Sequence, residues 1–430
     1  MARWEDGLPD APPKIKDFFD EARKLEEEYK YREAINQYEA CFQPETTDSQ
    51  RAALHLLIGN CFRSLSELEE AEGHYREAEA AAREMEDNEG LAAALGNTGL
   101  IYKTRGELDK ALDYHQQSME IDKKMGRKEG EANQLGNIGL IYTTKGDLDK
   151  ALEYHQQAFK IDREIGNLEG QASDLCNIGS IYIIKGGLDT ALNYNQQALK
   201  INQEIGRKER EAKQLGNIGV IYWHMGDLNK ALEYHQHALK IDRDIRNRDG
   251  EAKQLGNIGN IYGTKRELDK SLEYHQQALK IHRDIGNRGG EATGLGNIGV
   301  IYQIKGELDE ALVYLQQSLN IDQEMGNRDG EAVDLGNIGN IFLLQGELDR
   351  ALDYQQQALK IDTEIGLKKG EATQLHNIGL VYDEKGDLNK ALEYLRQALK
   401  IFEEIGAKIE IERTKRNIQR IMERMGRSRG

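Results

Sequence analysis

The sequence has few prolines, few cysteines and no long apolar run. All 4 prolines lie within the first 44 of its 430 residues, so the rest of the chain lacks the residue that blocks helical hydrogen bonding. This stretch is free to be almost entirely helical. The 3 cysteines, Cys41, Cys61 and Cys176, are scattered, which excludes a disulfide-rich class and suits a reducing compartment.

Two further absences restrict the location and the partners. No apolar stretch approaches the roughly 18 to 20 residues of a membrane span, and the first residues lack the apolar centre of a signal peptide. The net charge of −17 argues against binding to nucleic acid or anionic membranes, because both depend on clustered Lys and Arg. We therefore expect a cytoplasmic protein that inserts into no membrane and binds no nucleic acid.

What the sequence does contain is a repeat of 40 residues. The tripeptide Asn-Ile-Gly, once Asn-Thr-Gly, ends at Gly99, Gly139, Gly179, Gly219, Gly259, Gly299, Gly339 and Gly379. In the unit at residues 131–170, apolar residues recur at three- and four-residue spacing in two stretches, which predicts two amphipathic helices. Gly146 and Asp147 mark the turn between them, and Gly166 and Asn167 mark the turn to the next unit.

Gly139 falls inside the first helix of its unit, where a glycine costs about 1 kcal/mol relative to alanine. We expect close packing to compensate for this cost. The missing side chain would let the two helices of a unit approach each other, with Gly139 facing Ala151, twelve residues further on.

The repeat divides the chain into segments. Residues 15–90 contain two divergent units, in which Gly59 lies 40 residues before Gly99. Residues 91–406 contain eight regular units, and residues 407–425 match the start of a further unit without a second helix, as expected of a capping helix. We expect residues 1–14 to form a flexible N-terminus and residues 426–430 a tail.

The pattern resembles the tetratricopeptide repeat (TPR). Counting Gly139 as position eight, the residues that carry the resemblance are Gly139, Tyr142, Ala151, Tyr154 with His155, and Ala158. The 40-residue period and the missing proline depart from the usual 34-residue repeat, and are similar to Pins-type polarity adaptors and, less closely, kinesin light chains. The resemblance implies an all-α solenoid, a right-handed superhelix of about ten repeats with a C-terminal capping helix. Its first helices would line a concave groove.

In the resembling families, positions two, five, six, nine, twelve and thirteen of the first helix face the groove. Position six is asparagine in eight consecutive units, namely Asn97, Asn137, Asn177, Asn217, Asn257, Asn297, Asn337 and Asn377. The resemblance implies that these amides hold the backbone of an extended peptide. The alternative is that each asparagine binds its own loop or a neighbouring helix.

Positions twelve and thirteen vary most between units, yet several of them are apolar. Water-facing sites gain nothing from apolar side chains, so we assign the binding preference to these positions. They include Ile183, Ile184, Trp223, His224, Ile304, Leu343 and Leu344, with Lys213 and Lys253 at position two as nearby cations. The alternative is neutral drift combined with packing between repeats.

No constellation of catalytic or metal-ligating residues interrupts the repeat. Histidines recur at His115, His155, His235 and His275. A metal site needs three or four converging ligands, whereas these lie on successive repeats, so we interpret them as packing residues. The tyrosines at position eleven are interpreted as core. We expect no enzymatic activity, no cofactor and no metal.

The sequence therefore predicts a protein-interaction scaffold that binds a protein or peptide in its groove. Two alternatives stay open: a structural protein that assembles through its ends or outer wall, and a ligand-sensing regulatory solenoid. Residues 1–90 contain 11 basic and 23 acidic side chains, and residues 406–430 contain 8 and 3. Opposite ends of this kind favour a weak homo-oligomer, or they merely keep the cap soluble.

Overall fold

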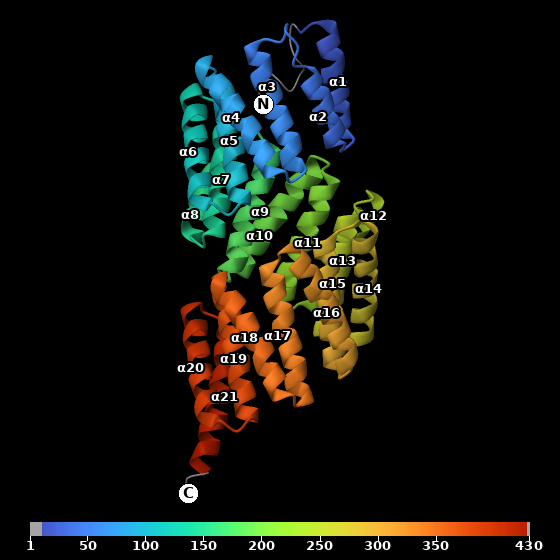
Figure 1. The fold of residues 1–430 in the computed structure, drawn as a ribbon, viewed down its shortest axis with the longest axis vertical. Coiled ribbons are helices and arrows are strands. Elements are labelled where there is room, and N and C mark those ends of the chain that lie inside the picture. The colour runs from blue at the N-terminus through green and yellow to red at the C-terminus, as the bar shows by residue number, and fades with distance from the viewer. Residues whose placement is uncertain (1–10, 428–430) are drawn as a thin grey trace. The chain divides into compact units, whose positions relative to one another are not determined.

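The computed structural model describes residues 11–427, which form twenty-one α-helices and no strand. The all-α fold is therefore confirmed. The number of described helices equals that of ten helix pairs and one capping helix. The chain divides into two compact units, Met1–Met225 (unit 1) and Gly226–Gly430 (unit 2) (Figure 1). The first helix begins at Pro13 and the last ends at Arg427. The predicted flexible N-terminus and tail thus lie largely outside the described residues.

Unit 1 contains eleven of these helices, most of them 17 residues long. They are α1 (Pro13–Glu27), α2 (Tyr31–Ala40), α3 (Asp48–Ser64), α4 (Leu68–Glu84), α5 (Asn88–Thr104), α6 (Leu108–Met125), α7 (Lys128–Thr144), α8 (Leu148–Glu164), α9 (Leu168–Ile184), α10 (Leu188–Glu204) and α11 (Lys208–His224).

Unit 2 contains the other ten. They are α12 (Leu228–Asp244), α13 (Arg248–Thr264), α14 (Leu268–Asp284), α15 (Arg288–Lys305), α16 (Leu308–Met325), α17 (Arg328–Gln345), α18 (Leu348–Glu364), α19 (Lys368–Glu384), α20 (Leu388–Glu404) and α21 (Lys408–Arg427).

The turn between the helices of a repeat follows from two residues. Gly146 adopts φ +79°, and its N–H donates to the carbonyl oxygen of Thr143 at 3.1 Å. The carboxylate of Asp147 then accepts a hydrogen bond from the N–H of Lys150 at 3.3 Å and caps α8. The left-handed glycine ends one helix and the aspartate begins the next, as the sequence predicts.

Arg266 occupies the turn position that glycine takes in most repeats, with φ +62°. A residue with a Cβ is strained in this region by roughly 1 kcal/mol. Because Arg266 is exposed and makes no ion pair among the described residues, we expect Arg266→Gly to stabilise the protein by about 0.5 to 1 kcal/mol. Thermal unfolding would measure this, with Gly286→Ala (φ +69°) as the reverse substitution that lowers stability. A lower stability of Arg266→Gly would contradict the expectation.

In most repeats, the helical glycine at position eight faces the side chain at position twenty-four. A Cβ on Gly139 would lie 2.8 Å from the Cδ2 and Nε2 atoms of His155. Ala151, the predicted neighbour of Gly139, is fully buried. In an equivalent repeat the backbone of the position-twenty alanine also lies close, because a Cβ on Gly299 would lie 3.2 Å from the carbonyl oxygen of Ala311. The histidine ring needs more room than an alanine, and the absent side chain provides it.

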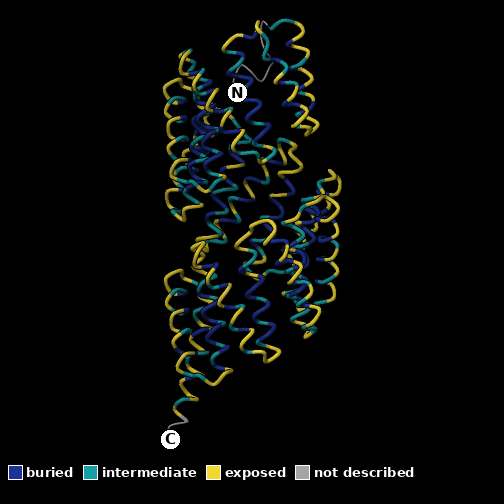
Figure 2. Tube along the Cα trace, viewed as in Figure 1, coloured by how far each residue is buried: buried dark blue, intermediate teal, exposed yellow. Residues whose placement is uncertain are grey.

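The core of each repeat lies between its two helices, and Figure 2 shows buried residues along the sides of the helices that face each other. The rings of Tyr142 and Tyr154 stack with centroids 5.4 Å apart, and equivalent pairs recur in both units. The tyrosines of position eleven thus pack against position twenty-three, as the core interpretation predicts.

Several pairs of successive first helices within a unit also contact each other. Direct contacts join α3 with α5, α7 with α9, α15 with α17, and α17 with α19. Within residues 11–427, no two successive second helices of one unit contact each other as extensively. Elements that approach closely lie on the inner side of a bent stack, so the first helices form the inner face of each unit.

Candidate peptide-binding surface

We use the term first-helix surface for positions two, five, six, nine, twelve and thirteen of α5, α7, α9 and α11 in unit 1 and of α13, α15, α17 and α19 in unit 2. These positions follow one another along the inner face of each unit. They contain all the residues that the sequence analysis assigns to peptide binding.

The eight asparagines of position six are half-buried. Three donate long hydrogen bonds within the protein: Asn97 to Asn60 Oδ1 at 3.3 Å, Asn217 to Cys176 Sγ at 3.4 Å and Asn377 to Gln355 Oε1 at 3.4 Å. All three acceptors are side chains of the preceding repeat rather than loop backbone.

The other five asparagine side chains make no hydrogen bond to any described residue. They are Asn137, Asn177, Asn257, Asn297 and Asn337. Each amide carries two donors and an acceptor, and a half-buried amide with neither used inside the protein is available to a ligand.

The apolar residues of positions twelve and thirteen are unequally exposed. Ile184 and Leu344 are each 61% exposed, Ile304 is 47% exposed and Trp223 is 38% exposed. The Trp223 and His224 rings lie side by side at the end of α11, with centroids 5.2 Å apart. Position thirteen thus presents apolar surface to solvent in several repeats.

Leu343 and Ile183 differ from these residues. Both are half-buried, and Leu343 packs against a hydrophobic cluster that includes Ile338 and Phe342. Part of the Leu343 side chain therefore belongs to the core of unit 2. At this pair of positions, Leu344 is the better probe of an interaction surface.

The first-helix surface holds two pockets in the same register, one in each unit. The pocket between α9 and α11 and the pocket between α17 and α19 each have a volume of about 350 Å³. The first is lined by Asn177 and Lys213, the second by Asn337 and Asn377. Each pocket lies where the position-six asparagine of one repeat faces the first helix of the next.

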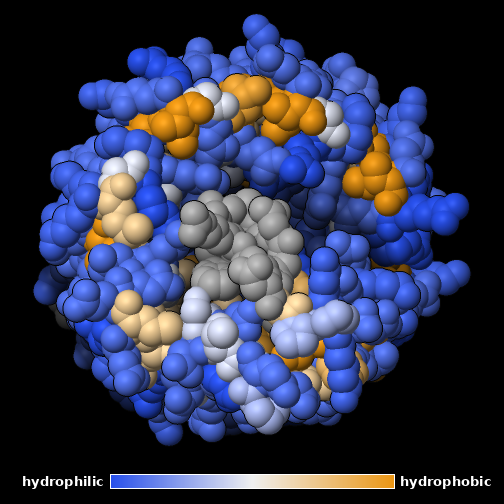
Figure 3. Space-filling model, turned by 90° about the horizontal axis from the view of Figure 1, so that it is seen from above, coloured by the Kyte–Doolittle hydropathy of each residue, from blue (hydrophilic) through white to orange (hydrophobic). Residues whose placement is uncertain are grey.

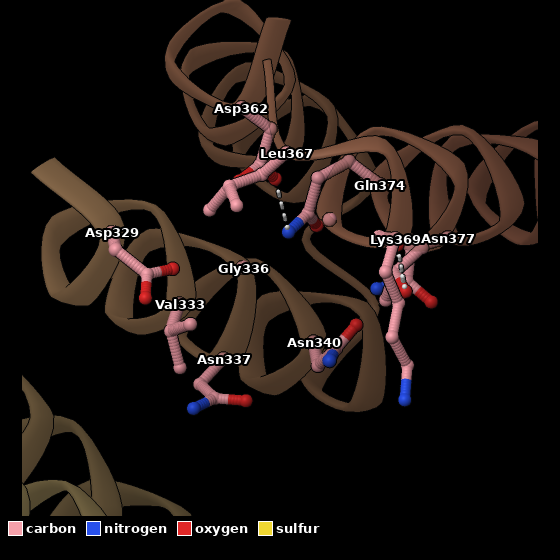
Figure 4. Close-up of a pocket in the computed structure, with 12 residues that line it drawn as sticks. Asp329, Val333, Gly336, Asn337, Asn340, Asp362, Leu367, Lys369, Gln374 and Asn377 are labelled. Carbon is pink, nitrogen blue, oxygen red and sulfur yellow. Dashed lines mark hydrogen bonds between the residues drawn. The ribbon is translucent and has the colours of Figure 1, made fainter. Parts of the chain in front are cut away.

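The α17–α19 pocket brings together residues that the sequence analysis missed. Asp329 lies at the start of α17, Asp362 near the end of α18, and Gln374 and Lys369 on α19 (Figure 4). The sequence contains one signal of this site: Leu367 stands where each of the six preceding repeats has asparagine or arginine. The two lysines of position two also differ, since Lys213 lines its pocket whereas Lys253 pairs with Asp249 at 2.5 Å.

The recurring histidines are buried packing groups. Burial lowers the pKa of His115 and His235, and it lowers the pKa of His275 to about 4, so these rings are neutral at pH 7. Within residues 11–427, no three His, Cys, Asp or Glu side chains are grouped closely enough to hold a metal ion. In the same residues, no helix is both long and apolar enough to cross a bilayer.

Comparisons with solved structures show the same kind of fold. The apo form of the quorum sensor NprR from B. thuringiensis aligns with a TM-score of 0.56 at 14% identity, over 81% of this chain and 97% of that one. A Rap protein complexed with competence and sporulation factor aligns with a TM-score of 0.51 at 14% identity, over 78% and 99%.

A third structure is a signal transduction ATPase with a tetratricopeptide repeat sensor from Pyrococcus horikoshii. It aligns with a TM-score of 0.55 at 18% identity, over 81% of this chain and 55% of that one. At these identities the likeness concerns the fold. No curated protein matches this chain in sequence.

The family itself follows from the sequence. The tetratricopeptide repeat profile matches residues 50–124, 131–204, 210–284, 290–364 and 332–404. These matches cover well over half of the chain and include both pockets of the first-helix surface. The chain therefore belongs to the tetratricopeptide repeat family.

Proposed function

We propose that this protein is an interaction scaffold that holds an extended segment of a partner protein along its first-helix surface. Five asparagine amides without an internal partner support this function most directly. Two lie in unit 1 and three in unit 2, always at the same position of the repeat.

The spacing of these amides suits an extended chain. Neighbouring helices pack about 8 to 10 Å apart, and an extended peptide advances about 3.3 Å per residue. One asparagine then meets about every third ligand residue. An amide both donates and accepts, so it satisfies the N–H and C=O groups of a peptide of any sequence.

The neighbouring pockets and apolar groups would add selectivity. Ile184, Ile304 and Leu344 place apolar surface beside the asparagines, and the two pockets have room for individual side chains. One structural neighbour is described as a quorum sensor and another as a Rap protein complexed with competence and sporulation factor, so a protein of this fold does hold another molecule.

A displayed library of random dodecapeptides, selected on the full chain, tests this function. The wild type is compared with a variant in which the five asparagines without an internal partner are replaced by alanine. Each hydrogen bond between an asparagine amide and the peptide contributes about 1 kcal/mol net to the binding free energy. Loss of two such bonds lowers the affinity for selected peptides about 30-fold. Fluorescence anisotropy with labelled peptides would measure the affinity. Thermal unfolding should be unchanged, because these amides make no bond inside the protein.

A matched control removes five amides from the second helices. It carries alanine at Gln116, Gln156, Gln196, Gln276 and Gln356, which are all exposed. We expect this variant to bind the peptides as the wild type does. Equal losses in both variants, or undiminished binding by the asparagine variant, would show that the peptides do not occupy the first-helix surface.

A further inference from the structure

We propose that the pocket between α17 and α19 binds a lysine or arginine side chain of the partner segment. This inference rests on the proposed function and adds to it the chemical class of one ligand residue. The pocket has two carboxylates, an unused carbonyl oxygen and apolar walls, which together match an aliphatic stem with a cationic head.

The two carboxylates come from different helices. Asp329 is exposed at the start of α17, and Asp362 is 2% exposed near the end of α18. Burial raises the pKa of Asp362, the Gln374 amide opposes this, and the negative charge of Asp329 raises the pKa further. Both carboxylates line the same pocket, so a cation bound there would interact favourably with both.

In three other repeats, the residue 38 positions further on binds the carboxylate that is equivalent to Asp329. Arg127 pairs with Glu89 at 3.3 Å, Arg207 pairs with Glu169, and the amide of Asn287 donates to Asp249 at 2.9 Å. For Asp329, the residue at this distance along the chain is Leu367, which donates nothing. Asp329 makes no ion pair or hydrogen bond to another described residue.

Leu367 also leaves the Asp362 carboxylate without a hydrogen-bond donor that other repeats provide. In three other repeats an asparagine five residues after the buried aspartate donates to it: Asn167 to Asp162 at 2.9 Å, Asn247 to Asp242 at 2.9 Å and Asn327 to Asp322 at 2.8 Å. Asp362 has Leu367 at that place. One substitution thus removes a donor from both carboxylates, and a ligand cation would take its place.

An unused acceptor points to the same ligand. Gln374 is 5% exposed, and its Nε2 donates to Asp362 at 3.3 Å, but its Oε1 has no hydrogen-bond partner among the described residues. This oxygen lies over Gly336, where a Cβ would come within 2.9 Å of it. A buried carbonyl oxygen without a donor costs about 1 to 3 kcal/mol, which a ligand N–H group would recover.

The walls suit the aliphatic stem of such a side chain. Val333 on α17 is 53% exposed, and Figure 4 shows Leu367 on the facing side of the pocket. The pocket's own cation does not neutralise the aspartates, because Lys369 pairs with Glu410 at 3.4 Å and points away from them. Long cationic side chains bury their methylene groups against surfaces of this kind.

The corresponding pocket of unit 1 has the opposite character. Its lining includes Arg210 and Lys213 and no carboxylate. The register of the repeat therefore supplies the cavity, and the residues that differ between repeats supply its charge. A preference for cations is thus a property of the α17–α19 pocket rather than of the repeat.

The test begins with peptides selected on the full chain from the random dodecapeptide library. We expect lysine or arginine to be enriched at one position. Replacing that residue by glutamine should weaken binding of the peptide to the wild type at least tenfold. The same replacement should hardly change binding to Asp329→Asn, which lacks one of the two carboxylates. It should also hardly change binding to Leu367→Asn, in which the new amide donates to the carboxylates. Both changed residues are exposed at the pocket rim, so both variants should fold.

Asp249→Asn is the matched control, since Asp249 lies at the same repeat position but is already paired. It should retain the tenfold dependence on the peptide's cation. A cation dependence that is equal in the wild type and Asp329→Asn would overturn this inference, and so would selected peptides without enriched cations. Failure of the wild type to capture any peptide would instead overturn the proposed function, and this inference with it.

Discussion

Asp334→Asn should raise the free energy of unfolding at pH 8 by on the order of 3 to 4 kcal/mol. Asp334 is 3% exposed on α17, and its Oδ2 has no hydrogen-bond partner in the described part of the chain. Burial raises the pKa of this carboxyl to about 7, against only partial relief from the Ser318 hydroxyl. At pH 8 the protein therefore holds a buried charge that nothing neutralises.

The Asp334 carboxyl lacks the partner that the equivalent aspartate of another repeat has. Asp174 occupies the same position in its repeat, and its Oδ1 lies 3.3 Å from Nδ1 of His155, nineteen residues earlier. Nineteen residues before Asp334 stands Leu315, which is fully buried and offers no proton. This repeat therefore has the buried aspartate but lacks the histidine that would contact it.

The pH dependence has a definite sign. The native carboxyl keeps its proton up to about pH 7, whereas the unfolded chain releases it near pH 4. Its contribution to stability therefore falls as the pH rises from 4 to 7. Urea unfolding at pH 4.5, 6 and 8 should show Asp334→Asn gaining on the wild type across this window.

Asp309→Asn is the control for net charge, because Asp309 is exposed. It should differ from the wild type by the same small amount at every pH. A pH-independent difference for Asp334→Asn, or a wild type that is more stable at pH 8, would show that Asp334 is not the buried acid described above.

Two glycines in α13 should respond to alanine with opposite signs. A Cβ on Gly259 would lie 2.7 Å from the Cδ2 and Nε2 atoms of the buried His275 ring, whereas a Cβ on Gly256 meets nothing within 4 Å. Overpacking costs about 1 to 3 kcal/mol, and alanine recovers about 1 kcal/mol of helix propensity. We expect Gly259→Ala to destabilise by up to roughly 2 kcal/mol and Gly256→Ala to stabilise by roughly 0.5 to 1 kcal/mol.

Urea midpoints of the two variants measure this difference within one helix, so helix propensity cancels in the comparison. The double variant Gly259→Ala/His275→Ala should show coupling, because removal of the ring makes room for the new methyl group. Equal effects of the two alanines would mean that close packing against position twenty-four does not hold these glycines in place.

Much of the fold is predictable from the sequence because its signals are local. The 40-residue period, the spacing of apolar residues and the Gly146–Asp147 turn depend on residues within one helical hairpin. The contact between Gly139 and His155 was not predicted, because the two residues lie on different helices. Spacing alone does not reveal which side chain fills the gap.

The candidate surface is less predictable, for the same reason. The position-six asparagines stand out in the sequence, but whether their amides bind internally depends on neighbours in the preceding repeat, as for Asn97 and Asn60. The character of the α17–α19 pocket depends on Leu367. This residue cannot bind Asp362, five residues earlier, or Asp329, 38 residues earlier, as polar residues at its position do in other repeats. Leu343 was assigned to the surface by its variability, and only the packing around it shows its share in the core.

Photo-crosslinking tests most directly whether the first helices form the docking surface. A selected peptide carrying one photoreactive residue would be bound to the full chain, irradiated and mapped by mass spectrometry. We predict adducts on α7, α9, α13, α15 or α17, which carry the partnerless asparagines, and loss of these adducts in the five-asparagine variant. Adducts on the exposed faces of the second helices, unchanged by that variant, would contradict the account.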